Sequence, residues 1–387
     1  MTVLRYNEIS TLRHYEKMKI LLLGEYSNVH ATLAEGLKAL GHEVTVVSNG
    51  DFWKDYPRDI DLSRRYTKWG GIQYLAKVYS LLPKFRGYDI VQLINPMFLE
   101  LKADRIFPIF DYLKKHNKKV ILGAFGMDYY WVNTCTNIKP LRYSDFNIGE
   151  KTRTDEPAVR EQKDWIGTDK ERLNKHIANE CHAIVAGLYE YQVCYEMFFP
   201  RKTTFIPFPI KGEFKKNDEK PSPQPSRIKM FIGISKGRSE YKGTDIMLRA
   251  ARRVQSKHPD LVQLQVAEGI PYNQYKEMME GSDLILDQLY SYTPSMNPLL
   301  AMSKGIICVG GGEPENYEII HEDTLRPIIN VLPNEESVFN ALEEIVLHRE
   351  RIPELKRQSI EYVRKHHDYI KVARQYENLY QGYNNQY

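Results

Sequence analysis

Three basic residues lie among glycines in the segment 235–243. They are Lys236, Arg238 and Lys242. Two fixed cations stabilise the negative charge that grows when a bond to a diphosphate breaks, and glycine lets a backbone approach such a group closely. We therefore expect Arg238 and Lys242 to hold a leaving diphosphate, with Lys236 competing for the position of Arg238. Solvated charges on a loop are the alternative interpretation.

A second phosphate-binding candidate follows the short apolar run that ends before Asp287. Ser295, Met296 and Asn297 come directly before Pro298. Asn297 suits a helix N-cap, and proline suits a first helical turn. Because a helix N-terminus collects unpaired N–H groups and about half a positive charge, we expect residues 295–297 to bind a diphosphate through backbone donors. Asp287 is a further donor-binding candidate.

A glycine-rich turn lies farther along the chain, in the segment 309–315. Gly312 is the third of three consecutive glycines, and Glu313 and Glu315 follow it. The glycines let the backbone approach a ligand, and the two carboxylates can accept hydrogen bonds from sugar or ribose hydroxyls. A tight turn with solvated acids is the alternative.

The first half of the chain offers candidates that follow two predicted strands. Gly126 and Asp128 come after the run 120–122, and Ser27 and His30 come after Gly24. We expect Asp128 to orient an acceptor hydroxyl, although an aspartate here also suits a helix cap. Open α/β sheets bind ligands in a crevice at the carboxyl ends of their strands. Ser27 suits either this crevice or a helix cap, and His30 faces the crevice or the solvent. The absence of G-x-G-x-x-G after the first strand argues against a dinucleotide dehydrogenase.

Two series of apolar runs must position these residues. The predicted strands are 20–24, 44–47, 90–93, 120–122 and 183–186, then 229–234, 262–266, 284–286 and 306–309. Runs alternating with helical spacing indicate α/β units with parallel sheets. The polar segment 211–226, with three prolines, predicts a linker between the two series of strands.

The expected fold is thus α/β, with two Rossmann-like domains facing each other across a cleft. The first domain spans 18–208 and the second 227–363, and a helix over about 364–387 packs back on the first domain. The aperiodic stretch 133–170 predicts a long excursion from the first sheet, which either carries function or only covers the sheet.

The segments 24–47, 122–129, 232–245 and 287–302 together resemble glycosyltransferase family 4, whose members have the GT-B fold. The first of them contains the turn Gly41-His42-Glu43-Val44. The resemblance implies an acceptor bound by the first domain, a nucleotide-sugar bound by the second, and transfer with retention. It also implies that Arg238 and Lys242 hold the donor diphosphate without a metal or other cofactor.

The chain departs from that family at its pair of glutamates eight positions apart. The matching positions hold Tyr292 and Leu300. The resemblance therefore indicates a divergent member that lacks this motif. Two alternatives stay open: a catalytically degenerate protein that binds a sugar nucleotide, and a sugar-nucleotide epimerase of the same fold.

Composition limits the partners that we expect. The net charge of +4 arises from 54 basic and 50 acidic residues, which is unlike a nucleic-acid binder. The four cysteines form no CxxC pair, and the donor-side segments contain no Asp-x-Asp pair to hold Mg²⁺, so no metal is expected. Without an apolar leader or an 18-residue apolar stretch, we expect a cytoplasmic protein. Peripheral contact with the inner membrane surface, through a glycan or lipid-linked glycan acceptor, is compatible with this charge.

Overall fold

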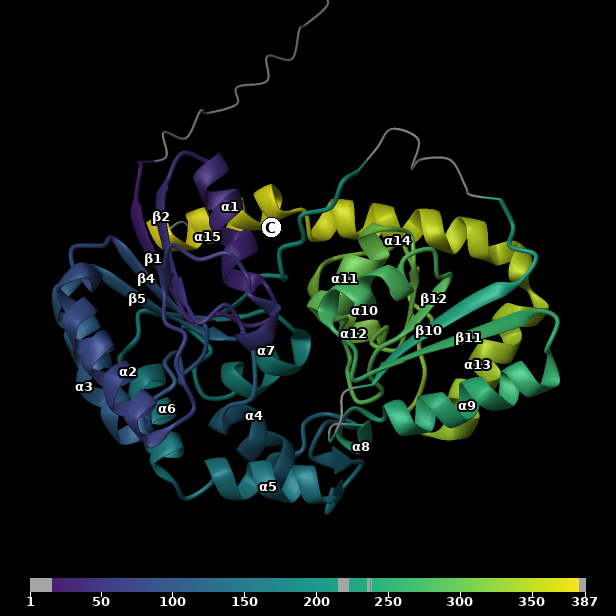
Figure 1. Ribbon diagram of the computed structural model, residues 1–387, viewed down its shortest axis with the longest axis horizontal. Helices are drawn as coiled ribbons and strands as arrows, with labels where there is room; N and C mark the ends of the chain where they lie inside the picture. Colours follow the sequence, from purple (N-terminus) through teal and green to yellow (C-terminus); the bar gives the residue numbers. More distant parts are fainter. Residues whose placement is uncertain (1–15, 215–222, 235–236, 238, 383–387) are drawn as a thin grey trace, which may run out of the picture.

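Buried apolar runs form the strands of two parallel sheets in the computed structural model, which describes residues 16–214, 223–234, 237 and 239–382. Each sheet belongs to one of two α/β lobes (Figure 1). The predicted α/β class is confirmed. The exact domain limits, including the linker 211–226, stay a prediction, and residues 215–222 of that linker lie outside the described residues.

The first sheet has seven strands in the order β3-β2-β1-β4-β5-β8-β9. Its strands are β1 (Lys19–Leu23), β2 (Glu43–Ser48), β3 (Ile60–Asp61), β4 (Ile90–Leu93), β5 (Lys119–Ala124), β8 (Ala183–Ala186) and β9 (Thr203–Phe205). The helices around it are α1 (Val29–Ala39), α2 (Lys68–Leu81), α3 (Ala103–His116), α4 (Tyr129–Asn133), α5 (Glu156–Trp165), α6 (Asp169–Glu180) and α7 (Tyr189–Glu196). The strand order reverses beside β1, which places a ligand-binding crevice at its carboxyl end.

The second sheet has four strands in the order β11-β10-β12-β13. They are β10 (Ile228–Ile234), β11 (Val262–Glu268), β12 (Leu284–Leu286) and β13 (Ile307–Val309). The accompanying helices are α8 (Ser239–Lys242), α9 (Thr244–Lys257), α10 (Tyr272–Met279), α11 (Met296–Ser303), α12 (Pro314–Ile319), α13 (Glu335–Leu347) and α14 (Ile352–His366). Here the order reverses beside β10.

Alternating side chains fill both faces of the second sheet. Met230 and Ile232 pack into a core beneath α9 and α13, whereas Phe231 points to the opposite face. Ile285 and Cys308 share that opposite face, whose core continues into the core of the first lobe. Strands β12 and β13 are buried at every residue and are continuous apolar runs, which explains why the sequence reveals them.

The stretch 133–170 leaves the first sheet, as predicted, but it is not wholly irregular. It contains a π-helical turn (Thr134–Ile138), the hairpin of β6 (Asn147–Ile148) and β7 (Lys151–Thr152), and α5. Asp155 caps α5 by accepting the N–H of Ala158 at 3.3 Å. The stretch therefore carries ordered elements toward the second lobe.

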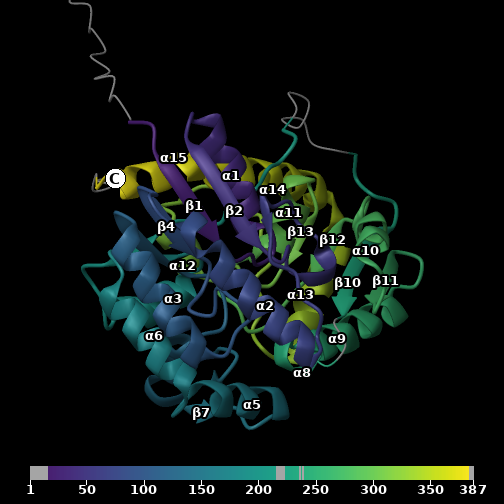
Figure 2. The same cartoon turned by 60° about the vertical axis from the view of Figure 1, so that its left-hand side comes forward.

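The chain crosses between the lobes at two adjacent segments. The N–H of Ile210 donates to the carbonyl of His367 at 2.6 Å, and the N–H of Tyr369 donates back to the carbonyl of Ile210 at 3.2 Å. Beyond this crossing, α15 (Tyr369–Gln381) packs on α1, and Figures 1 and 2 both show the two helices side by side. The last described helix thus belongs to the first lobe.

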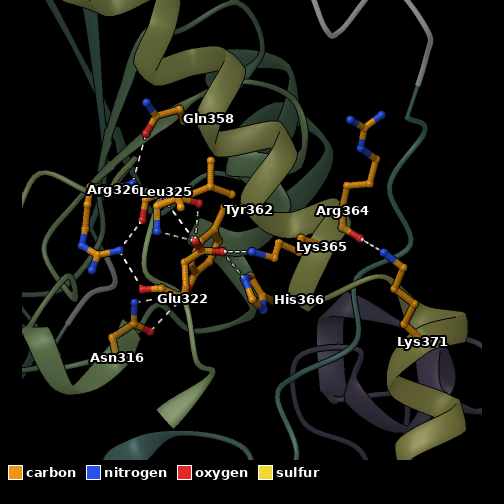
Figure 3. Close-up of polar contacts among 11 residues, drawn as sticks. Asn316, Glu322, Leu325, Arg326, Gln358, Tyr362, Arg364, Lys365, His366 and Lys371 are labelled. Carbon is orange, nitrogen blue, oxygen red and sulfur yellow. Dashed lines mark hydrogen bonds and ion pairs between the residues drawn. The ribbon is translucent and has the colours of Figure 1, made fainter. Parts of the chain in front are cut away.

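A buried carboxylate anchors the end of α14 just before this crossing (Figure 3). Glu322 accepts hydrogen bonds from Lys365 at 2.7 Å and from His366 at 2.6 Å, and also from the backbone N–H of Leu325 at 2.9 Å. Burial by itself would raise the pKa of Glu322, but these hydrogen bonds hold it well below its ordinary value. The anchor fixes α14 to the second lobe up to the crossing.

No helix in the described ranges has the length and apolar character needed to cross a lipid bilayer.

Candidate interdomain site

The carboxyl ends of the two parallel sheets face each other, so loops from both lobes meet there. The loop after β8 leads into α7 of the first lobe, and the loop after β12 leads into α11 of the second. Ligands of open α/β sheets bind at such carboxyl ends. The side chains at this meeting form the candidate site.

Glu190, in the first turn of α7, binds the loop after β12. One carboxylate oxygen accepts the backbone N–H of Tyr292 at 2.5 Å and that of Thr293 at 3.1 Å. The other accepts the hydroxyl of Thr293 at 2.5 Å. Burial raises the pKa of Glu190. This carboxylate therefore fixes the backbone of the predicted donor loop against the first lobe.

Arg142, from the stretch between α4 and α5, binds both carboxylates of the glycine-rich turn. Its guanidinium donates to Glu315, and to Glu313 at 2.8 Å. Tyr143 also donates its hydroxyl to Glu313. The hydrogen bonds from Arg142 hold the pKa of Glu315 below its ordinary value. Glu313 and Glu315 thus lie between the lobes, where they pair with Arg142 and Tyr143, and their contact with a ligand stays a prediction.

Tyr292 occupies the position where the family resemblance expects the first glutamate. Its hydroxyl accepts the backbone N–H of Arg142 at 2.7 Å. Its ring lies 4.8 Å from that of Tyr143 and 5.8 Å from that of Tyr189, measured between centroids. Burial raises the pKa of Tyr292 to about 12, so the hydroxyl stays protonated. The side chain thus joins the lobes instead of presenting a carboxylate.

A cavity of about 60 Å³ lies between the lobes. Lys242 lines it, together with Trp131, Asp145, Leu188, Glu190, Tyr191, Gln288, Tyr290 and Ser291. The backbone carbonyl of Lys242 also accepts the N–H of Leu289 at 2.8 Å, so the loops after β10 and β12 are joined at the sheet's point of reversal. The structure therefore places Lys242 on the side of the second lobe that faces the first lobe.

Arg153 closes one side of this region. Its guanidinium carbon lies 3.9 Å from the centre of the Tyr290 ring, and it donates to the backbone carbonyl of Glu240 at 3.0 Å. Asp155 accepts from the same guanidinium at 2.9 Å. A largely desolvated cation from the first lobe thus covers the short helix α8, which carries Lys242.

The predicted donor residues at the start of α11 form one cluster. Asn297 donates to Asp287 at 3.1 Å and to the hydroxyl of Tyr275 at 2.9 Å, and the hydroxyl of Ser295 lies 3.5 Å from Asp287. The prediction that Asn297 caps this helix is wrong. Ser295 is the N-cap, because α11 begins at Met296 and the amide of Asn297 is engaged by Asp287.

Two predicted donor residues, Lys236 and Arg238, lie outside the described residues. A third, Gly312, is packed in the turn. Its N–H donates to Asn330 at 3.3 Å, and a Cβ at this position would lie 2.8 Å from Ile328. Gly312 serves the close packing of this turn.

Asp128, the predicted catalytic carboxylate of the first lobe, caps α4. It accepts the N–H of Trp131 at 2.9 Å and the hydroxyl of Tyr195 at 2.7 Å, and it is fully buried. Burial raises the pKa of Asp128 to about 7. The capping alternative is thus observed, and a role toward an acceptor stays a prediction. Gly126 lies nearby under the ring of Tyr26, where a Cβ would come within 3.2 Å.

The remaining first-lobe candidates surround the N-terminus of α1. Ser27 has a left-handed backbone with φ of 53°, and its N–H donates to Asp51 at 2.9 Å. His30 is fully buried and faces no solvent; its Nδ1 bonds the carbonyl of Gly24 at 2.8 Å. Burial lowers the pKa of His30 to about 3, so the ring is neutral.

Glu25 caps α1, a role that the sequence did not suggest. Its carboxylate accepts the N–H groups of His30 at 3.3 Å and Ala31 at 2.8 Å. Asn28 holds the N-cap position but makes no side-chain cap bond. Arg142, Tyr143, Arg153 and Glu190 were likewise missed, because their partners lie far away in the sequence and no local pattern marks them.

A second cavity, of about 480 Å³, lies beside the start of the linker. Leu300, which matches the family's second glutamate, lines it with Lys211, Gly212, Glu213, Glu280, Gly281, Ser303, Lys304 and Ile360. This cavity includes none of the predicted catalytic residues that the structure describes.

Within the described part of the chain, no three His, Cys, Asp or Glu side chains form a group that could hold a metal ion. The sequence Asp59-Ile60-Asp61 lies at the edge strand β3, where Arg58 and Ser63 bind Asp61. Independence from metals stays a prediction.

No family model matches this chain, and no curated protein matches it. Several solved structures share its fold. HepE of Anabaena, in complex with UDP and glucose, has a TM-score of 0.58 at 13% identity, covering 94% of this chain and 100% of that one. The catalytic domain of starch synthase IV of Arabidopsis thaliana, bound to ADP and acarbose, has a TM-score of 0.55 at 12% identity, covering 95% and 99%.

A third similar structure is a putative UDP-N-acetylglucosamine 2-epimerase of Listeria monocytogenes. Its TM-score is 0.52 at 11% identity, covering 93% of this chain and 95% of that one. At such low identity these likenesses concern the fold. The predicted fold, with two Rossmann-like domains in the GT-B arrangement, is therefore confirmed. Membership of glycosyltransferase family 4 stays a prediction.

Proposed function

We propose that this chain is a glycosyltransferase, which moves a sugar from a nucleotide-sugar bound by the second domain to an acceptor hydroxyl held by the first. The observation that carries the proposal is the interdomain cavity, where Lys242 meets the donor loop and the first domain. The same fold in HepE with UDP and glucose, and in starch synthase IV with ADP and acarbose, supports it.

The chemistry that we infer needs a cation where the diphosphate leaves. The bond from the sugar carbon to the diphosphate oxygen breaks as the acceptor oxygen bonds to the same face of that carbon, which retains the configuration. The acceptor proton passes to the departing phosphate. Lys242 and the N-terminus of α11, near Asp287 and Asn297, would stabilise the charge on the diphosphate without a metal.

Donor entry in this proposal requires the lobes to separate. A cavity of about 60 Å³ is far below the roughly 300–1,000 Å³ of ordinary small-molecule sites. The contacts of Glu190 with Tyr292 and of Arg142 with Glu315 would have to break and then form again. Closure over the donor would exclude water and limit its hydrolysis.

Two other functions are each supported by one specific observation. The similar epimerase structure supports a sugar-nucleotide epimerase, which would act without any acceptor. Tyr292 supports a protein that binds a sugar nucleotide without turning it over, because this residue replaces an expected glutamate and its hydroxyl is bonded to the first lobe.

Calorimetric titration with UDP, ADP and GDP, with and without EDTA, tests the donor site. We expect one nucleotide to bind with equal affinity in both buffers and Lys242→Ala to weaken it at least tenfold. Lys304→Ala is the matched control, because Lys304 lines the other cavity of the same domain. Failure of every nucleotide to bind would contradict a donor site of any kind.

Product analysis then separates the three functions. The wild-type protein is incubated with the sugar conjugate of the nucleotide that binds, with and without a panel of glycan acceptors. A glycosylated acceptor supports the transferase, and the anomeric configuration of the product tests retention. An epimerised sugar formed without acceptor favours the epimerase, and binding without turnover favours the degenerate protein.

A further inference from the structure

Exposed apolar side chains concentrate in one part of the first lobe. Thirteen large hydrophobic residues are exposed in the described chain, and six of them lie between residues 52 and 79. They are Phe52, Trp53, Tyr66, Trp69, Ile72 and Tyr79. Scattered single exposures need no explanation, but several exposed apolar side chains that share one helix face indicate an interaction surface.

Helix α2 presents the centre of this patch. Trp69 is 73% exposed and Ile72 59% exposed, whereas Tyr74 and Val78 on the other side are buried. Trp69, Ile72 and Tyr79 follow helical spacing, so they share one face. A helix that is apolar on both sides normally lies inside a protein. Figure 2 shows α2 in the foreground, at the outside of the first lobe.

The charged side chains of the chain segment that forms α2 and its flanks are all basic. Residues 62–88 contain six Lys and Arg residues and no Asp or Glu. Arg65, Lys68, Lys84 and Arg86 are exposed. The other two basic residues are engaged within the fold: Arg64 donates to the carbonyl of Glu100 at 2.9 Å, and the ammonium of Lys77 lies 3.8 Å from Asp61. The exposed cations therefore flank the apolar face.

Hydrogen bonds hold α2 in place at the end where the patch begins. Thr67 caps α2 by accepting the N–H of Gly70 at 3.0 Å. On the buried side, the hydroxyl of Tyr74 accepts the N–H of Glu100 at 3.2 Å. The exposed side chains of α2 are thus held on a fixed helix, with Lys68 of its first turn next to Trp69 and Arg65 just before the N-cap.

We propose that the α2 surface, made of Trp69, Ile72 and Tyr79 with Arg65 and Lys68, docks on an anionic phospholipid bilayer. Tryptophan and tyrosine favour the headgroup region, where their amphipathic rings lie between water and hydrocarbon. Isoleucine gains from burial in the acyl boundary. Lysine and arginine attract anionic lipids. One helix offers all three, and this proposal holds whether or not the chain transfers sugar.

Co-flotation of the full chain with vesicles tests the proposal. Neutral phosphatidylcholine vesicles are compared with vesicles containing phosphatidylglycerol in a one-to-one ratio, at low and high salt. We expect binding to the anionic vesicles only, weakened by salt. Arg65→Gln with Lys68→Gln should lower the affinity roughly 25-fold, since each charge near an anionic surface contributes about fivefold.

A second pair of variants tests whether the apolar face contributes to vesicle binding in addition to the charged side chains. Trp69→Ser with Ile72→Ser should abolish most of the binding to anionic vesicles. Leu332→Ser with Leu347→Ser is the matched control, because these residues are 52% and 60% exposed in the second lobe. All four side chains are exposed, so circular dichroism should show unchanged folding.

Two results would overturn the docking surface. One is the absence of wild-type binding to anionic vesicles. The other is equal vesicle binding by the wild type and both α2 variants, which would place the contact elsewhere. Loss of binding in the α2 variants with retention in the Leu332 and Leu347 control supports it.

Discussion

Glu190 of the first lobe accepts the backbone N–H of Tyr292 in the second lobe at 2.5 Å. The two residues belong to different domains, and the contact is buried. The loop that the sequence predicts to hold a donor is therefore fixed by a carboxylate of the opposite domain, so access to the donor loop and separation of the lobes are one event.

Replacing Glu190 by alanine should open the lobes. The change leaves the N–H groups of Tyr292 and Thr293 without their acceptor, at a cost of about 1–3 kcal/mol for each buried group. We expect a larger radius of gyration in small-angle X-ray scattering. Glu196→Ala, on the same helix but exposed, is the control. An unchanged scattering profile for Glu190→Ala would contradict a closing role for this contact.

Glu25 should make the stability of the fold depend on pH. Burial raises its pKa from 4.5 to about 8, so the folded state binds more protons than the unfolded state between these values. The free energy of unfolding should therefore fall as pH rises from about 5 to about 8, by up to roughly 1.4 kcal/mol per pH unit from this group.

Urea unfolding of the wild type and Glu25→Gln at several pH values measures that contribution. Glutamine cannot ionise, so the variant should lack this part of the decline even if its absolute stability is lower. His30 has a pKa lowered to about 3 by burial, and its contribution rises with pH in both proteins below about pH 6.5. Identical slopes in the two proteins would show that Glu25 titrates normally.

Two helical glycines should respond to alanine in opposite directions. A Cβ on Gly36 of α1 would lie 2.4 Å from the carbonyl oxygen of Tyr369 and 2.7 Å from the Cβ of Ala373. Gly36→Ala should thus destabilise by about 1–3 kcal/mol through overpacking. Gly71 of α2 meets only Arg64, at 3.6 Å, so Gly71→Ala should stabilise by about 0.4–1 kcal/mol. Thermal unfolding of both variants checks the signs.

The buried pair of His42 and Glu377 should hold α15 in place. The N–H of Met18 donates to Nδ1 of His42 at 3.2 Å, so Nε2 carries the proton that reaches Glu377 at 2.8 Å. His42→Ala leaves a buried carboxylate with only Arg374, which should cost about 3 kcal/mol. Glu43→Ala, which breaks an exposed pair with Lys19, should cost less than about 1 kcal/mol in the same urea titration.

The sequence predicted the strands well for a physical reason. Runs such as 120–122 and 183–186 are covered on both faces, so every side chain in them is apolar and the run is visible without knowing its neighbours. The edge strand β3 and the short β9 were not predicted, since each is brief and only partly buried. Strand order also depends on crossings that local patterns do not encode.

The site was predicted less completely because its contacts join the two domains. Lys242 and Asp287 were identified from glycine and strand-end patterns, which are local. Glu190 and Arg142 act on partners more than a hundred residues away, so their roles depend on how the domains meet. Asn297 shows the limit of propensity: it has a capping residue's chemistry, but Asp287 engages its amide.

The return of α15 to α1 has a consequence for biosynthesis. The strands of the first lobe, which lie between residues 19 and 205, leave the ribosome before the second lobe, and residues 369–381 follow the second lobe. At about 5–20 residues per second, the intervening stretch of about 160 residues takes roughly 8–32 s to translate. During that interval the groove of α1 at Gly36 has no Tyr369 or Ala373 against it. The first lobe therefore lacks its last helix for as long as the second lobe is being translated.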